Sequence, residues 1–162
     1  MSEIDKSDLL NLDLASGRVV IQLRADIAPL AAERLRTLSA EGFYDNVAFH
    51  RVISGFMAQG GDPTGTGSGG SKLPDLKAEF TRAAKFERGT VGMARTQDPN
   101  SANSQFFIMF EPSPHLDGQY TIVGQVTEGM DLVDKIKRGS GGGGVVTDPD
   151  RIVKMRPASA EA

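Results

Sequence analysis

One arginine stands in a pattern that would place a fixed positive charge beside apolar side chains. In the segment Phe49-His50-Arg51-Val52-Ile53, a strand puts Phe49, Arg51 and Ile53 on one face. An arginine between two large apolar side chains is costly unless it is paired or borders a cleft. The segment therefore predicts either a satisfied buried network or a cation at the wall of an apolar pocket.

Two further segments each combine an amide with an apolar side chain at the same spacing. Met57 and Gln59 share a face of one expected strand, and Gln105 and Phe107 share a face of another. Glycine-rich sequence lies beside these segments, with six glycines between positions 60 and 70. The combination favours an apolar cleft with Arg51 at its wall over a purely structural network.

Other catalytic chemistry has little support in the sequence. The chain has no cysteine, which excludes thiolate nucleophiles and cysteine-ligated metal sites. Its two histidines, His50 and His115, have no metal-ligand spacing to each other or to a carboxylate cluster. No G-x-S-x-G segment supplies a serine nucleophile. We therefore expect no metal and no cofactor.

The segment 65–70 matches G-x-G-x-x-G but lacks the context of a nucleotide site. Pro63 precedes it and Leu73-Pro74 follows it, whereas a dinucleotide site needs a strand before and a helix after. Lys72 is followed by Leu73 rather than by the Ser or Thr of a phosphate-binding loop. A mobile glycine loop is the better interpretation.

The elements that must position these residues are mostly strands. Apolar residues alternate with polar ones at 10–14 and 19–23 around a turn at 15–17, which indicates a hairpin. Further strands are expected at 48–53, 57–60, 91–94, 106–109, 121–126 and 151–156. Helices are expected from Pro29, which suits a first helical turn, and over 130–138. This order predicts a mainly β fold, a closed eight-stranded antiparallel β-barrel capped by two α-helices.

Size and charge place the chain in a broad class. Its 162 residues suit a single domain over 1–162, with flexible tails at 1–8 and 157–162. The net charge of −3 argues against nucleic acid as a partner. The polar N-terminus does not look like a signal peptide, and no apolar run approaches the roughly 20 residues of a membrane helix. We expect a cytoplasmic monomer that binds neither nucleic acid nor membrane.

From about Leu9 to Met155 the chain resembles the cyclophilin-type peptidyl-prolyl cis-trans isomerases. The segments that carry the resemblance, in order, are 49–53, 55–62, 89–94, 104–108 and 116–118. The resemblance implies an eight-stranded barrel with two capping helices and a site on its outer surface.

The resemblance also implies a role for each matching position. Arg51 is the catalytic arginine, and Gln59 holds it and touches the substrate. The implied substrate-binding residues are Phe56, Met57, Phe107 and Leu116 around the proline, then Ala94, Arg95 and Gln105 along the preceding segment, with His115 and Tyr120 nearby.

Three of these positions depart from the commonest eukaryotic pattern of the family. His115 stands where many members have tryptophan, which implies weak binding of cyclosporin. Tyr120 replaces a common histidine and Arg95 a common asparagine, which implies an altered substrate preference.

The implied activity is rotation about X–Pro bonds in peptides and in unfolded or partly folded proteins, as an aid to protein folding. Rotation crosses a barrier of ~18–20 kcal/mol without breaking a covalent bond, so no nucleophile, metal or redox group is needed. Arg51 would stabilise the twisted amide. The alternative is a module that binds proline-containing loops, or a chaperone, with little useful turnover.

Overall fold

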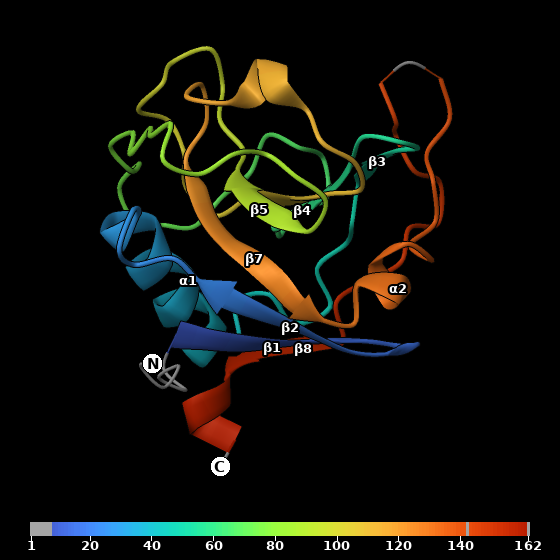
Figure 1. Cartoon of the computed structure of the whole chain (residues 1–162). Coiled ribbons are helices and arrows are strands. Elements are labelled where there is room, and N and C mark those ends of the chain that lie inside the picture. The colour runs from blue at the N-terminus through green and yellow to red at the C-terminus, as the bar shows by residue number, and fades with distance from the viewer. Residues whose placement is uncertain (1–7, 142, 162) are drawn as a thin grey trace.

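An eight-stranded antiparallel sheet forms the body of the molecule in the computed structural model, which describes residues 8–141 and 143–161 (Figure 1). Its strands are β1 (Leu9–Leu14), β2 (Gly17–Leu23), β3 (Arg51–Ile53), β4 (Met57–Gly60), β5 (Thr90–Met93), β6 (Phe106–Met109), β7 (Ile122–Glu128) and β8 (Lys154–Pro157). The expected hairpin is confirmed as β1 and β2, which pair along their whole length from Leu9 opposite Gln22 to Leu14 opposite Gly17.

The sheet curls into an open half-barrel, so the expected closed barrel is not confirmed. Its strand order is β3-β4-β6-β5-β7-β2-β1-β8, and among the described residues no ladder joins the edge strands β3 and β8. These edges meet only through irregular chain, where Ala48 and Arg151 form an isolated bridge. Both edge strands are shorter than expected, starting at Arg51 and Lys154, and backbone hydrogen bonds join the irregular segments 46–49 and 150–152 that precede them.

The helices are α1 (Pro29–Ala40) and α2 (Met130–Val133), together with the short 3₁₀ helices η2 (Pro114–Leu116) and η3 (Ala158–Glu161). The prediction of an α-helix over 130–138 is wrong beyond Val133. There the chain tightens, and the N–H groups of Lys135 and Ile136 donate to carbonyls three residues back. Of the expected tails, residues 1–7 and 162 lie outside the described residues, whereas Pro157 pairs with Leu10 in the sheet and 158–161 form η3.

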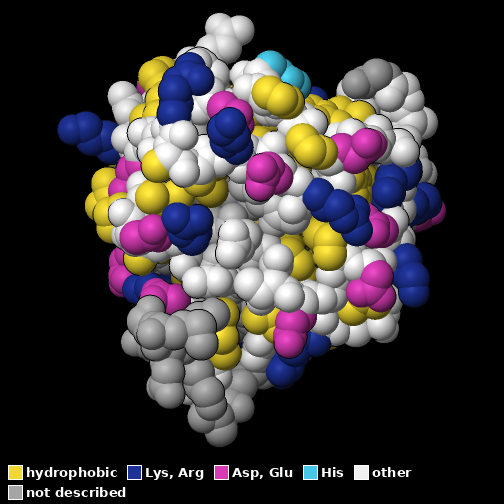
Figure 2. All heavy atoms as spheres, in the orientation of Figure 1, with side chains coloured by type: hydrophobic (Ala, Val, Ile, Leu, Met, Phe, Trp, Pro, Cys, Tyr) yellow, Lys and Arg dark blue, Asp and Glu magenta, His cyan; other side chains and the backbone are white. Residues whose placement is uncertain are grey.

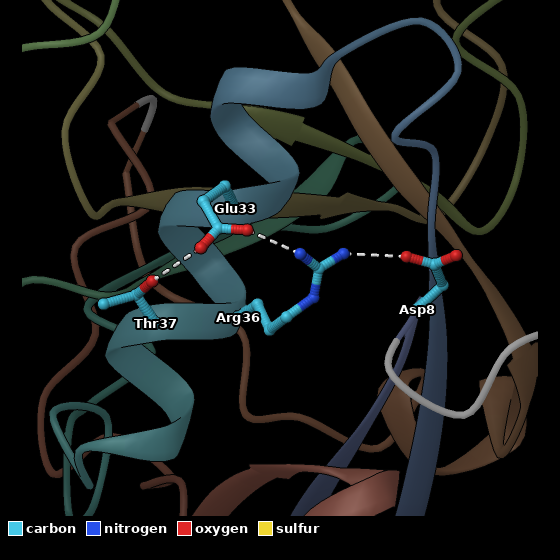
Figure 3. Close-up of polar contacts among 4 residues, drawn as sticks. All are labelled: Asp8, Glu33, Arg36 and Thr37. Atoms are coloured by element: carbon cyan, nitrogen blue, oxygen red, sulfur yellow. Dashed lines mark hydrogen bonds and ion pairs between the residues drawn. The ribbon is translucent and has the colours of Figure 1, made fainter.

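Helix α1 packs against β8 and β7, whereas α2 packs against β2. Figure 3 shows how Arg36 ties α1 to the start of the first strand. Its guanidinium bonds Glu33 within the helix at 2.6 Å and Asp8, just before β1, at 2.7 Å. These bonds therefore fix helix α1 next to the start of β1. No helix in the described part of the chain has both the length and the apolar character to cross a membrane.

Alternate side chains of the strands feed two separate apolar clusters. Phe106 and Ile108 of β6 point into the main core inside the half-barrel, and Phe107 and Met109 join a smaller cluster on the outer face, as the period of two predicts. The prediction that Phe49 shares a face with Arg51 is wrong. Phe49 lies fully buried in the main core, away from the outer face of Arg51 and Ile53, because β3 begins only at Arg51 and the alternation does not extend to Phe49.

The surface carries both signs of charge. On the face in Figure 2, Lys and Arg side chains are interspersed with Asp and Glu. That face therefore has no large field of one sign.

Candidate active site

A cavity of about 120 Å³ opens on the outer face of the sheet, over the second apolar cluster. It brings together all the predicted site residues except Gln105 and His115. Its lining is Arg51, Phe56, Met57, Gln59, Ala94, Arg95, Phe107, Leu116 and Tyr120. The strands β3, β4 and β6 and the helix η2 each contribute, so residues far apart in the chain meet at one point.

Arg51 is held at the cavity wall by two hydrogen bonds. Its Nη1 donates to Gln59 Oε1 at 3.1 Å, and its Nε donates to the carbonyl oxygen of Gly143 at 3.0 Å. Among the described residues, its Nη2 has no hydrogen-bond partner, so this end of the guanidinium is available to a ligand. Figure 1 shows the loop that contains Gly143 beside β3.

The floor of the cavity is aromatic. Phe107 is buried and stacks on Phe86 with ring centroids 5.7 Å apart, and Tyr120 meets Phe107 edge-on at 5.8 Å. Gly92 makes room for this stack, because a Cβ there would lie 2.6 Å from Phe107 and 2.7 Å from Phe86. Such rings offer a flat apolar surface to a small ring.

Arg95 closes one side of the cavity by stacking and by bonds to backbone. Its guanidinium lies 4.5 Å from the ring centroid of Tyr120 and 5.6 Å from that of Phe80. It also donates to the carbonyl oxygens of Gln119 and Thr96, each at 2.8 Å at the closest. Most of its donors are therefore committed to the protein.

Gln105 lies beside the first cavity, in a second one of about 520 Å³ that shares Gln59, Ala94 and Arg95 with it. Loop residues 67–71 form the opposite wall. The Oε1 of Gln105 accepts a hydrogen bond from Gln59 Nε2 at 2.9 Å, so the two glutamines connect the walls of the two cavities.

The two histidines lie apart from the cavity lining. His115 is exposed on η2, with its ring 6.1 Å from that of Phe56. His50 is buried, its Nδ1 has no partner among the described residues, and burial lowers its pKa. No three His, Asp or Glu side chains in the described part of the chain gather as a metal site would require.

Sequence reasoning missed several groups that build the site. Gly143 lies in a glycine run that carries no side-chain signal, and only the fold brings its carbonyl to Arg51. Phe86 and Phe80 belong to the mid-chain concentration of phenylalanine, which was visible in the sequence without indicating their contacts.

Known proteins are similar to this chain in sequence and in fold. Residues 9–157 match the family model described as cyclophilin type peptidyl-prolyl cis-trans isomerase/CLD. A protein of Brucella suis named probable peptidyl-prolyl cis-trans isomerase is 52% identical over 165 residues, covering 94% of this chain and 84% of the relative. A peptidyl-prolyl cis-trans isomerase of Helicobacter pylori is 41% identical over 140 residues, covering 85% of each.

Solved structures of cyclophilins have a similar fold. A cyclophilin from Hirschia baltica superposes with a TM-score of 0.88 at 28% identity, covering 99% of this chain and 77% of that one. A cyclophilin-type peptidyl-prolyl cis-trans isomerase from Cryptosporidium parvum, crystallised in the presence of the dipeptide Ala-Pro, superposes with a TM-score of 0.83 at 31% identity. That match covers 92% of this chain and 98% of the other.

Proposed function

The chain belongs to the cyclophilin-type peptidyl-prolyl cis-trans isomerases, and we propose that Arg51 carries its catalysis from the wall of the 120 Å³ cavity. The observation that carries the proposal is the position of this guanidinium. It is held by Gln59 and by the carbonyl of Gly143, with Nη2 left for a substrate, beside the aromatic floor.

The chemistry follows from the electronic structure of the X–Pro bond. In the planar states, the nitrogen lone pair is delocalised into the carbonyl, which creates the barrier of ~18–20 kcal/mol. In the twisted transition state, the nitrogen regains its lone pair and can accept a hydrogen bond. A donor aimed at that nitrogen binds the twisted state better than either planar state, which is the condition for acceleration.

Arg51 suits this role through its charge and shape. A guanidinium stays charged and presents its donors in a rigid plane, so two of them can be fixed by the protein while a third faces the substrate. The apolar floor of Phe107 and Met57 excludes water around the proline ring, which strengthens the hydrogen bond to the nitrogen. No proton is transferred and no bond is broken.

We propose that the residues before the proline run toward Gln105. Ala94, Arg95 and Gln59 line both cavities, so a peptide whose proline lies over Phe107 has a continuous path into the larger one. The bonds of the Arg95 side chain to backbone leave the peptide contacts at 94 and 95 mainly to main-chain groups. The Cryptosporidium parvum structure with Ala-Pro supports a proline peptide as the ligand class.

The proposed substrates are proline-containing peptides and partly folded proteins, bound by a monomer in the cytoplasm. Support for flexible substrates comes from the position of the cavity on the outer face of the sheet, where an extended X–Pro segment can enter from solvent.

Exchange spectroscopy on an X–Pro peptide tests the proposal without a coupling protease. We expect the purified chain to raise the cis–trans exchange rate, equally with and without a chelator. Absence of acceleration would reject an enzyme, and acceleration lost with the chelator and restored by a metal would reject the mechanism through Arg51 alone. A peptide titration would show whether an inactive chain still binds proline.

A further inference from the structure

The loop after β4 is built around one buried carboxylate. Asp62 is fully buried, yet the loop that follows it is largely exposed. Its carboxylate accepts the backbone N–H groups of Thr64, Thr66, Gly67 and Gly69 at 2.6–3.1 Å. Burial by itself would raise the pKa of Asp62, but bonds from Thr64, Gly69 and Gly67 hold it well below its usual range. The loop is therefore wrapped around a negatively charged carboxylate.

The same loop residues hold Gln105 from their other side. The carbonyl oxygens of Gly67 and Gly69 accept Gln105 Nε2 at 2.8 and 3.0 Å. Their N–H groups are those that Asp62 binds. The backbone at Gly69 packs closely on Asp62, since a Cβ at Gly69 would lie 2.2 Å from the Asp62 carboxylate. The carboxylate thus anchors the two loop residues whose carbonyls bind Gln105.

This arrangement fixes the direction of two side-chain amides. A carboxamide has one donor end and one acceptor end. Because two carbonyls bind the NH₂ of Gln105, its Oε1 faces Gln59 and accepts from Gln59 Nε2 at 2.9 Å. The NH₂ of Gln59 is then occupied, so its Oε1 faces Arg51 Nη1 at 3.1 Å. With Gln59 reversed, an NH₂ group would face the guanidinium and the bond would be lost.

We propose that Asp62 is a positioning residue for the isomerase reaction, acting on Arg51 through the carbonyls of Gly67 and Gly69 and the Gln105–Gln59 pair. It lines neither cavity. The inference rests on the proposed role of Arg51. It adds that Asp62 fixes the orientation of the two side-chain amides that hold this arginine.

The first test replaces Asp62 with asparagine, which keeps the size of the side chain. Either orientation of the new amide turns an NH₂ toward backbone N–H donors that now bind a carboxylate. We expect kcat for an X–Pro peptide to fall about tenfold with KM changed less than about twofold, since the proline pocket is untouched. The matched control is Asp45→Asn, whose carboxylate pairs with Arg156 outside both cavities and whose loss should leave kcat unchanged.

A spectroscopic readout separates positioning from general stability. In the substrate-free protein, we expect the side-chain NMR signals of Gln59, Gln105 and Arg51 Nε to shift in Asp62→Asn and to stay in place in Asp45→Asn. A folded Asp62→Asn protein with wild-type kcat and unmoved signals would overturn the proposal. These signals do not depend on turnover. They therefore test whether Asp62 positions Arg51 even if the chain shows no isomerase activity.

The second test breaks the same chain of bonds one step further on. Gln105→Glu still accepts from Gln59 but cannot donate to the carbonyls of Gly67 and Gly69. We expect it to lower kcat and shift the Gln59 and Arg51 signals as Asp62→Asn does, and the double variant to lose no more kcat than either single one. Losses that multiply would reject a shared route. If Asp62→Asn does not fold, unmoved signals in folded Gln105→Glu overturn the proposal, and moved signals with reduced kcat support it.

Discussion

Arg51 and Gln59 are direct cross-strand partners in the ladder of β3 and β4, and their side chains meet at 3.1 Å on its outer face. Opposed residues of an antiparallel pair have Cβ atoms about 4.5–5.5 Å apart, so the backbone itself brings the amide to the guanidinium. The position of Arg51 is therefore set by sheet register, and the bond from Arg51 Nε to Gly143 completes it.

Replacing Arg51 with alanine should lower kcat/KM by about 10–150-fold while the fold stays intact. Losing a charge-assisted hydrogen bond costs ~1.5–3 kcal/mol, which gives that range in rate. Arg51→Lys should also be poor, because an ammonium cannot bond Gln59, Gly143 and substrate in one plane. Exchange rates and circular dichroism measure both effects. Arg24→Ala is a matched control, since this arginine pairs with Asp26 and does not line the cavity. A folded Arg51→Ala protein with full activity would remove Arg51 from the mechanism.

Phe107→Ala should weaken proline binding and stability together. Truncating a buried phenylalanine costs about 3–5 kcal/mol, and here it also removes the stacked floor of the cavity. Urea unfolding and KM per folded molecule measure the two effects. The neighbouring Phe106 lies in the main core, so Phe106→Leu should cost stability without changing KM, whereas Phe107→Leu should change both. If Phe107→Leu changes stability alone, Phe107 belongs to the fold and not to the site.

His115→Trp should tighten inhibition by cyclosporin about 5–30-fold with little change in turnover. An indole adds roughly 50–80 Å² of apolar contact over an imidazole, worth ~1–2 kcal/mol at about 25 cal/mol per Å². His115 is exposed beside Phe56 and outside the cavity lining, so the larger ring has room without displacing substrate. Inhibition constants of the two proteins decide the point. Equal constants would make position 115 irrelevant to the drug and leave the isomerase assignment untouched.

Acid should remove the stabilising effect of Asp62. Its pKa in the folded chain is lowered, so the folded state holds fewer protons than the unfolded state between the two pKa values. The contribution is fully present above the unfolded value near pH ~4 and is lost as the pH falls through the folded value. The unfolding free energies of wild type and Asp62→Asn should differ by a constant amount from pH 7 to about 5 and converge below pH ~4. A difference that stays constant down to pH ~2 would mean that the pKa of Asp62 is the same in the folded and unfolded states, so that the fold does not lower it.

The local sequence pattern was sufficient for the main elements and for much of the site. The period of two in Phe106-Phe107-Ile108 correctly separates core from cavity, because successive side chains on a strand point to opposite faces. The ordered motifs around Arg51, Gln59 and Phe107 identify residues that the structure does bring to one cavity. These features depend on neighbours a few residues away.

Only the tertiary structure decided how distant segments complete those features. Phe49 has the strand period of Arg51 but lies in the core, because edge strand β3 starts two residues later. Sheet closure depended on whether two edges far apart in the chain would pair, and among the described residues no ladder joins β3 to β8. The carbonyl of Gly143 binds Arg51, and Asp62 is linked to Arg51 through backbone groups of its loop and through two glutamines. The residue types alone do not indicate the direction of these backbone groups. Contacts of this kind depend on the path of the whole chain, which a local pattern does not encode.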